Sequence, residues 1–139
     1  MVDKNIVYRY LESLEDSISR IRNMDLTPEM ITGDEDIQDL LDRRMQKAIE
    51  ACIDIAGHVV AANKLGRAEI SGSLFQILAK HKIIPQKLGQ NLEKVVGLRN
   101  IIVHEYTQID YQLAYSNLEE KLADLEAFAK QIKNYLGRS

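Results

Sequence analysis

One stretch of ten residues, from Gly97 to Tyr106, brings together side chains that could act on a phosphate. Arg99 supplies a guanidinium, whose planar fork of donors suits phosphate oxygens. Five positions later His104 supplies an imidazole, the side chain that most readily transfers a proton near neutral pH. Asn100 adds an amide that could orient either group. These residue types suit metal-free cleavage of RNA, in which the histidine moves the proton of a ribose 2′-hydroxyl or of the leaving group while the arginine holds the phosphate.

The position of these residues on a helix decides whether they can meet. At about 100° per residue, Arg99 falls within the apolar stripe of the predicted helix, together with Val103 and Tyr106, whereas Asn100 and His104 lie about 100–140° away. Arg99 and His104 can therefore act on one atom only if the helix ends or bends near Val103, or if a second subunit brings its copy across a cleft. We expect a homodimer, because a site built from two copies needs less distortion than one built from a single copy.

Length and composition bound the class of protein. A chain of 139 residues supports one domain of ordinary size, which we take as 1–139. A hydrophobic share of 45% and only two prolines argue against disorder. A single cysteine, Cys52, excludes a disulfide framework and a cysteine-rich zinc site. No stretch has the pattern of a signal peptide or a membrane span, so we expect a cytoplasmic protein without a membrane partner.

The net charge of −3 conceals an uneven distribution of charges. The segment from Ile70 to Arg99 carries five lysines and arginines against one acid, Glu93. The segment from Glu29 to Asp54 carries eight acids against three basic residues. Two interpretations stay open: two ordinary solvent-exposed faces, or a basic approach surface opposed to an acidic one.

Apolar residues recur at steps of three and four along most of the chain, which predicts an all-α fold. No segment alternates with the two-residue period of a strand. The last helix repeats its apolar positions in alternating steps of four and three, as helices packed in a bundle do. The sequence therefore predicts an antiparallel bundle of four to five helices. Its expected helices are 3–23, 34–63, 71–82, one from Pro85 that carries the site, and one that Asp110 caps and that runs to 136, with a short turn at 27–33.

An acidic ladder on the second long helix is a further candidate site. Glu50, Asp54 and His58 are spaced four residues apart and share one face. Such a ladder could hold a metal ion, but a solvent-exposed face is the simpler interpretation, and pairing of Asp54 with Arg99 is the alternative. We therefore predict no metal site and no cofactor, and treat Asp54, like Asn100, as a supporting residue.

The string from Gly97 to Tyr106 also resembles a known signature. Arg99, four intervening residues, His104, one further residue and Tyr106 are similar to the arginine–x4–histidine–x–tyrosine signature of HEPN domains, specifically of the HepT-like toxins of prokaryotic toxin–antitoxin pairs. The resemblance covers nearly the whole chain and includes the strings SGSLFQILAKHKIIP and GLRNIIVHEY. It implies a homodimeric, metal-independent endoribonuclease in which Arg99 and His104 are catalytic. It also implies an MntA-like nucleotidyltransferase antitoxin that adenylylates the motif tyrosine, here Tyr106.

Two other interpretations remain open at this point. In the first, Arg99 is a buried residue that ties helix ends together and His104 is a C-cap donor. In the second, the chain is a catalytically inactive HEPN-like module that binds a nucleotide or a nucleotidyltransferase partner. The active and inactive modules need the same cleft, so the sequence does not separate them.

Overall fold

Four long helices form the body of the computed structural model, which describes residues 2–104 and 108–138. They are α1 (Lys4–Arg22), α3 (Glu35–Ala62), α5 (Gln86–Val103) and α7 (Leu118–Arg138). Three short helices join them: α2 (Pro28–Gly33), α4 (Ser73–Lys80) and α6 (Tyr111–Ala114). These two described ranges contain no strand, which confirms the predicted all-α class, and none of their helices is long and apolar enough to span a membrane.

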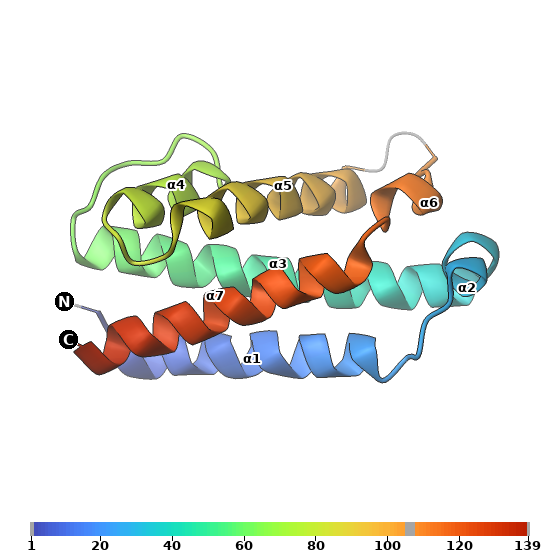
Figure 1. Ribbon diagram of the computed structural model, residues 1–139, viewed down its shortest axis with the longest axis horizontal. Helices are drawn as coiled ribbons and strands as arrows, with labels where there is room; N and C mark the ends of the chain where they lie inside the picture. Colours follow the sequence, from blue (N-terminus) through green and yellow to red (C-terminus); the bar gives the residue numbers. More distant parts are fainter. Residues whose placement is uncertain (1, 105–107, 139) are drawn as a thin grey trace.

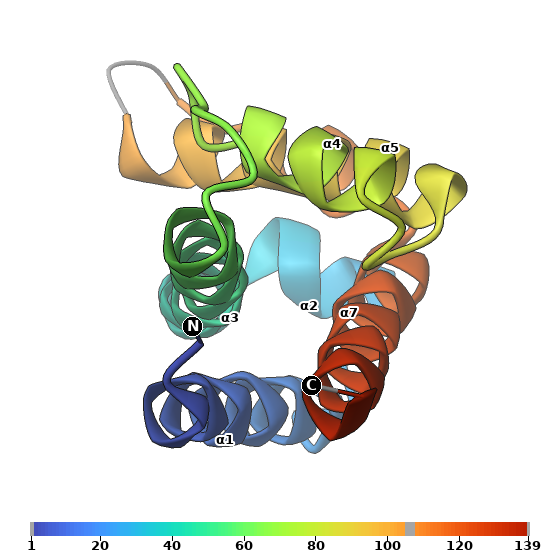
Figure 2. The same ribbon diagram turned by 90° about the vertical axis from the view of Figure 1, so that its left-hand side faces the viewer.

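The long helices run alternately in opposite directions along one axis (Figure 1). Seen end on, they surround a common core, and each is in contact with the helices beside it (Figure 2). The predicted antiparallel bundle is therefore confirmed. Both termini lie at one end of the molecule, whereas α2, α6 and the end of α5 lie at the other (Figure 1).

Side-chain caps begin several helices at the positions that the sequence predicts. Thr27 accepts the backbone N–H of Met30 at 3.2 Å, directly before the proline that opens α2. Asp34 accepts the backbone N–H of Asp36 at 3.0 Å and begins α3. Asp110 begins α6 by the same kind of bond. These caps satisfy backbone donors that helix starts otherwise leave unpaired.

The first half of α5 is fixed by close packing against α4. A methyl group added at Gly89 would lie 3.1 Å from both the Cβ atom of Ala79 and the carbonyl oxygen of Phe75, so any larger residue would require the two helices to move slightly apart. The ring of Phe75 meets that of Phe128 on α7 edge-on, with 5.5 Å between centroids. Since α5 is held on this side, its last turns have a defined position for the candidate site.

The last predicted helix is interrupted, so its prediction as one continuous helix is wrong. Tyr115 ends α6, and Asn117 adopts a left-handed backbone conformation with φ of 59° before α7 begins. The hydroxyl of Ser116 donates to the carbonyl oxygen of Leu113 at 2.9 Å. The ammonium group of Lys121 donates to the carbonyl oxygen of Ser116 at 2.7 Å. Local polar contacts of this kind compete with helical hydrogen bonds, and apolar spacing does not reveal them.

Candidate functional site

The last turns of α5 carry the residues that could act on a phosphate. The helix ends at Val103, and His104 is its C-cap residue, whose backbone N–H donates to the carbonyl oxygen of Asn100 at 3.1 Å. The backbone of His104, with φ of −104° and ψ of 53°, departs from helical geometry. His104 and Asn100 are exposed, whereas Arg99 is partly buried. The helix therefore ends at Val103, which is one of the two alternatives that the helical projection left open.

Arg99 is a partly buried cation without a protein partner among the residues that the structure describes. Its Nε atom is buried and donates no hydrogen bond there. None of the ion pairs in those residues includes Arg99. A buried donor without an acceptor costs about 1–3 kcal/mol, so a guanidinium in this state is favourable only if something else supplies an acceptor. A phosphate oxygen can do so, whereas the interpretation in which Arg99 ties helix ends together finds no bond to support it.

Asp54 does not pair with Arg99. It is exposed, and no ion pair joins the two side chains. The loss of part of its hydrating water, and then the nearby charge of Glu50, raise the pKa of Asp54, whereas a neighbouring arginine would lower it. His58 accepts the backbone N–H of Asp3 at 3.1 Å through its Nε2 atom. No group of three or more His, Cys, Asp or Glu side chains that could hold a metal ion occurs within residues 2–104 and 108–138.

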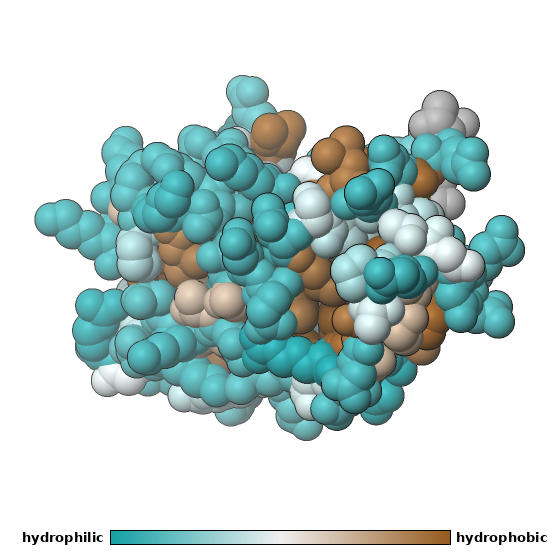
Figure 3. Space-filling model, turned by 45° about the vertical axis from the view of Figure 1, so that its right-hand side comes forward, coloured by the Kyte–Doolittle hydropathy of each residue, from teal (hydrophilic) through white to brown (hydrophobic). Residues whose placement is uncertain are grey.

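Apolar side chains reach the surface beside His104. Ile101 is 50% exposed and Val103 is 41% exposed. The last turn packs on its own chain through Ile102, which is 7% exposed, and leaves Val103 of the predicted stripe at the surface. Seen with the end that carries α2 and α6 turned forward, the molecule shows hydrophobic residues at the surface among polar ones (Figure 3). An apolar surface of this kind is suited to contact with a second subunit.

Tyr106 lies outside the described residues. Because α5 ends at Val103, the helical projection that brought Tyr106 to the side of Arg99 does not extend to it. Its role as the modified residue stays a prediction from the signature.

A buried carboxylate near this end of the bundle was not predicted. Asp42 on α3 is 7% exposed and accepts the hydroxyl of Tyr111 at 2.6 Å and that of Tyr115. The two tyrosine rings are stacked, with 5.9 Å between centroids. In the sequence, Asp42 is one of eight acids in an acidic segment, which gives no reason to single it out. One feature of the sequence could have indicated this contact. Tyr111 and Tyr115 are the first apolar positions of the last predicted helix, and buried tyrosine hydroxyls need hydrogen-bond partners.

Three positive charges lie close together at the other end of the bundle. Lys80, Lys82 and Arg138 line one hollow of about 550 Å³, and no acidic residue lies among its lining residues. His81, beside them, is exposed as predicted, with its Nε2 atom 3.1 Å from the carbonyl oxygen of Leu65. This concentration is compatible with a basic approach surface for RNA, although it lies at the opposite end of α5 from His104.

Comparison with known proteins places the chain in one family. A family model described as ribonuclease HepT-like matches residues 2–132. The chain is 33% identical over 129 residues to the mRNA nuclease HepT of Shewanella oneidensis, covering 93% of this chain and 97% of that protein. It is 27% identical over 131 residues to the tRNA nuclease HepT of Aphanizomenon flos-aquae, covering 94% of this chain and 85% of that protein.

The fold leads to the same family. The solved structure of the tri-AMPylated S. oneidensis HEPN toxin in complex with MNT antitoxin matches this structure with a TM-score of 0.85 and 33% identity, covering 93% of this chain and 97% of that one. The chain therefore belongs to the HepT-like ribonuclease family.

Proposed function

We infer that this protein is the endoribonuclease toxin of a toxin–antitoxin pair and that it cleaves RNA with Arg99 and His104. Its family and the names of its relatives, an mRNA nuclease and a tRNA nuclease, support the reaction class. One observation carries the choice of residues: the buried, unpartnered Nε atom of Arg99 lies five residues before an exposed imidazole at the end of the same helix. Asn100, exposed one turn before His104, is a supporting residue that orients the substrate.

The chemistry follows from these two side chains. Arg99 donates to the oxygens of the scissile phosphate and stabilises the charge that develops on them. His104 takes the proton of the ribose 2′-hydroxyl or gives one to the departing 5′-oxygen, and water carries out the other proton transfer. The 2′-oxygen forms a bond to phosphorus, the bond from phosphorus to the 5′-oxygen breaks, and the 5′-oxygen ends as a hydroxyl. The product is a 2′,3′-cyclic phosphate or the 3′-phosphate formed from it, and no metal ion takes part.

The partner is a nucleotidyltransferase antitoxin. The toxin of S. oneidensis was solved in an AMPylated form with an MNT antitoxin, and this chain matches almost all of it. We propose that an MntA-like enzyme inhibits this protein by AMPylation, in the cytoplasm, and that Tyr106 is the acceptor. The position of that tyrosine two residues after His104 supports this choice.

A cleavage assay with purified protein, mixed RNA and EDTA tests the proposal. The wild type should cleave RNA, and Arg99→Ala and His104→Ala should each abolish cleavage while keeping the helical circular dichroism spectrum. His58→Ala is the matched control, because that histidine binds the backbone of Asp3 at the end of the bundle near the termini and should be dispensable for cleavage. Undiminished activity of His104→Ala would refute the mechanism. Unfolding of both site variants would instead favour a structural role for the motif.

A further inference from the structure

The helix α3 ends in a motif that usually requires glycine, but a lysine occupies the glycine position. The backbone N–H of Lys64 donates to the carbonyl oxygen of Ala61 at 3.3 Å. The backbone N–H of Leu65 donates to the carbonyl oxygen of Val60 at 3.0 Å. This pair of bonds is a Schellman motif, in which the residue at the position of Lys64 adopts a left-handed conformation and is usually glycine. Lys64 adopts it with φ of 52°.

The helix α4 ends in the same way. The backbone N–H of Lys82 donates to the carbonyl oxygen of Ala79 at 3.0 Å, and Lys82 has φ of 59°. The backbone N–H of Ile83 donates to the carbonyl oxygen of Leu78 at 2.9 Å. Two Schellman motifs of this protein therefore carry a lysine where glycine is favoured.

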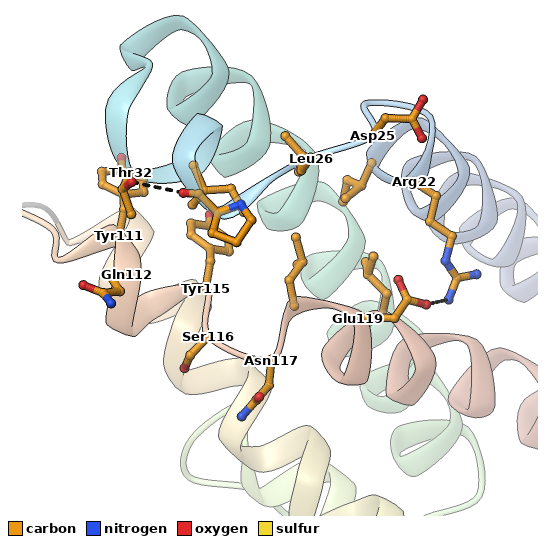
Figure 4. Close-up of a pocket in the computed structure, with 15 residues that line it drawn as sticks. Arg22, Asp25, Leu26, Thr32, Tyr111, Gln112, Tyr115, Ser116, Asn117 and Glu119 are labelled. Carbon is orange, nitrogen blue, oxygen red and sulfur yellow. Dashed lines mark hydrogen bonds and ion pairs between the residues drawn. The ribbon is translucent and has the colours of Figure 1, made fainter.

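Local conformation does not account for these two lysines. Among the residues that the structure describes, the others with a side chain and a positive φ are Asp25 and Asn117, which line the hollow of about 640 Å³ at the opposite end of the bundle (Figure 4). Aspartate and asparagine tolerate this conformation better than lysine does. A lysine also complements the helix dipole from within the last turn, where Lys80 lies, so the dipole does not require one beyond it. Unfavourable local choices of this kind are typical of functional positions.

The two lysines belong to one cationic surface. The side chain of His81, next to Lys82, lies 3.1 Å from the backbone carbonyl of the residue after Lys64, so the ends of α3 and α4 are in contact. Lys82 also lines the hollow of about 550 Å³ together with Lys80 and Arg138. These four cations, which we call the basic end, are exposed, and no ion pair in the described part of the chain includes them.

We propose that the basic end is a second RNA-binding surface, which binds phosphates of the substrate away from the cleaved bond. This inference rests on the proposed function. In a chain with a net charge of −3, a polyanion is attracted only where cations lack acidic partners. The hollow includes Gln86, the first residue of α5, and the 18 residues of that helix, at about 1.5 Å each, place the candidate site roughly 27 Å away. A strand with about 3.4 Å per nucleotide covers this distance with about eight nucleotides, so one RNA can contact both.

Glycine variants separate the binding of RNA from the stability of the fold. In Lys64→Gly/Lys82→Gly both Schellman motifs receive the residue that they favour, so the midpoint of urea unfolding should rise or stay unchanged. The affinity for RNA should nevertheless fall. If each lysine binds one phosphate, the slope of log K against log salt should become shallower by about 1.4, and Kd should rise roughly tenfold at about 0.15 M salt.

Fluorescence anisotropy measures Kd with a 2′-O-methyl RNA longer than this span, which stays intact because it lacks the attacking hydroxyl. Lys64→Gln/Lys82→Gln should lose as much affinity as the glycine variant, without the gain in stability. Arg43→Gln/Lys47→Gln is the matched control, because it removes two exposed charges from the acidic segment and should change Kd by about twofold at most. In the cleavage assay, both lysine variants should raise KM and keep kcat, because the end of α5 is unchanged.

Each outcome has a distinct meaning. Wild-type affinity in either lysine variant overturns this inference, as does an equal loss of affinity in the control. A lower unfolding midpoint of the glycine variant also overturns it, because the lysines would then stabilise the helix ends. The proposed function stands in these cases if the wild type cleaves RNA. A wild type that cleaves no RNA overturns the proposed function, and Kd for the 2′-O-methyl RNA then still decides whether the basic end binds RNA.

Discussion

Arg99 can bind whichever phosphate comes within its reach, whether it belongs to RNA or is attached to the protein itself. Adenylylation of Tyr106 would add a phosphodiester with one negative charge seven positions after Arg99 in the sequence. Such a group competes with the RNA phosphate for the same donors and reduces the positive charge that attracts it. Inhibition by this route would need no unfolding, and with the proposed roles of Arg99 and Tyr106, catalysis and its control would both depend on one guanidinium.

We predict that Tyr106→Phe keeps its fold and its ribonuclease activity and resists inactivation by the cognate nucleotidyltransferase with ATP. The measurement is intact mass before and after incubation, together with RNA cleavage. Tyr8→Phe is the control, because Tyr8 is 49% exposed and its removal should leave adenylylation unchanged. An adenylyl adduct that forms equally on the Tyr106→Phe variant, or a wild-type adduct that leaves activity intact, would contradict the assignment.

For single residues, the sequence predicts the contacts between positions that are close in the chain and misses those between positions that are far apart. Arg99, Asn100 and His104 share one stretch of helix, so their angular relation could be calculated from the helical period, whereas the end at Val103 was one of two alternatives that this calculation left open. The burial of Asp42 could not be predicted in this way. Its partners, Tyr111 and Tyr115, follow it by about seventy positions and have the spacing of ordinary core residues of a helix. The cost of burying its charge becomes visible only in three dimensions.

At the scale of the elements, the break between α6 and α7 is the main feature that apolar periodicity did not predict. A continuous helix would place Tyr111 and Tyr115 along the line of α7, whereas the break lets α6 turn toward α2 and α3. Asn117 makes the turn, because asparagine tolerates the left-handed conformation better than most residues with a side chain. The break therefore belongs to the architecture of the site end of the bundle.

Replacement of Asn117 should show what this turn requires. We expect Asn117→Ala to lower the free energy of unfolding by about 1 kcal/mol, since alanine is strained at φ of 59° and favours a continuous helix. Asn117→Gly is the matched variant, because glycine adopts this conformation freely, and it should stay within about 0.5 kcal/mol of the wild type. Urea unfolding followed by circular dichroism measures both. Equal stability of the alanine and glycine variants would show that the turn is not set by residue 117.

The whole molecule has two chemically different ends. One carries the end of α5, α6 and the exposed apolar residues Ile101 and Val103, and the other carries the hollow lined by Lys80, Lys82 and Arg138. A phosphodiester chain can therefore find positive charge away from the cleaved bond, despite the net charge of −3. A second subunit that covers Ile101 and Val103 would bring its own α5 to the same place, and the dimer would then be part of the site.

A site shared between two subunits can be distinguished from a site within one subunit by the activity of mixed dimers. If Arg99 of one subunit acts with His104 of the other, a mixed dimer of Arg99→Ala and His104→Ala keeps one intact pair. With random exchange, half of the dimers are mixed and each has one working site of two, so the mixture should recover roughly a quarter of wild-type activity. Each variant alone should be inactive, and light scattering should give a dimer at micromolar concentration.

The decisive comparison is between the mixture before and after subunit exchange, for example by unfolding and refolding the two variants together. Activity that appears only after exchange supports the shared site. Ile101→Glu is the control, because a charge on the exposed apolar face should weaken the dimer and lower activity while the four-helix core stays folded. A monomeric wild type, or a refolded mixture as inactive as its components, would place Arg99 and His104 of one subunit in one site. The departure of His104 from the helical path would then have to bring the two groups together.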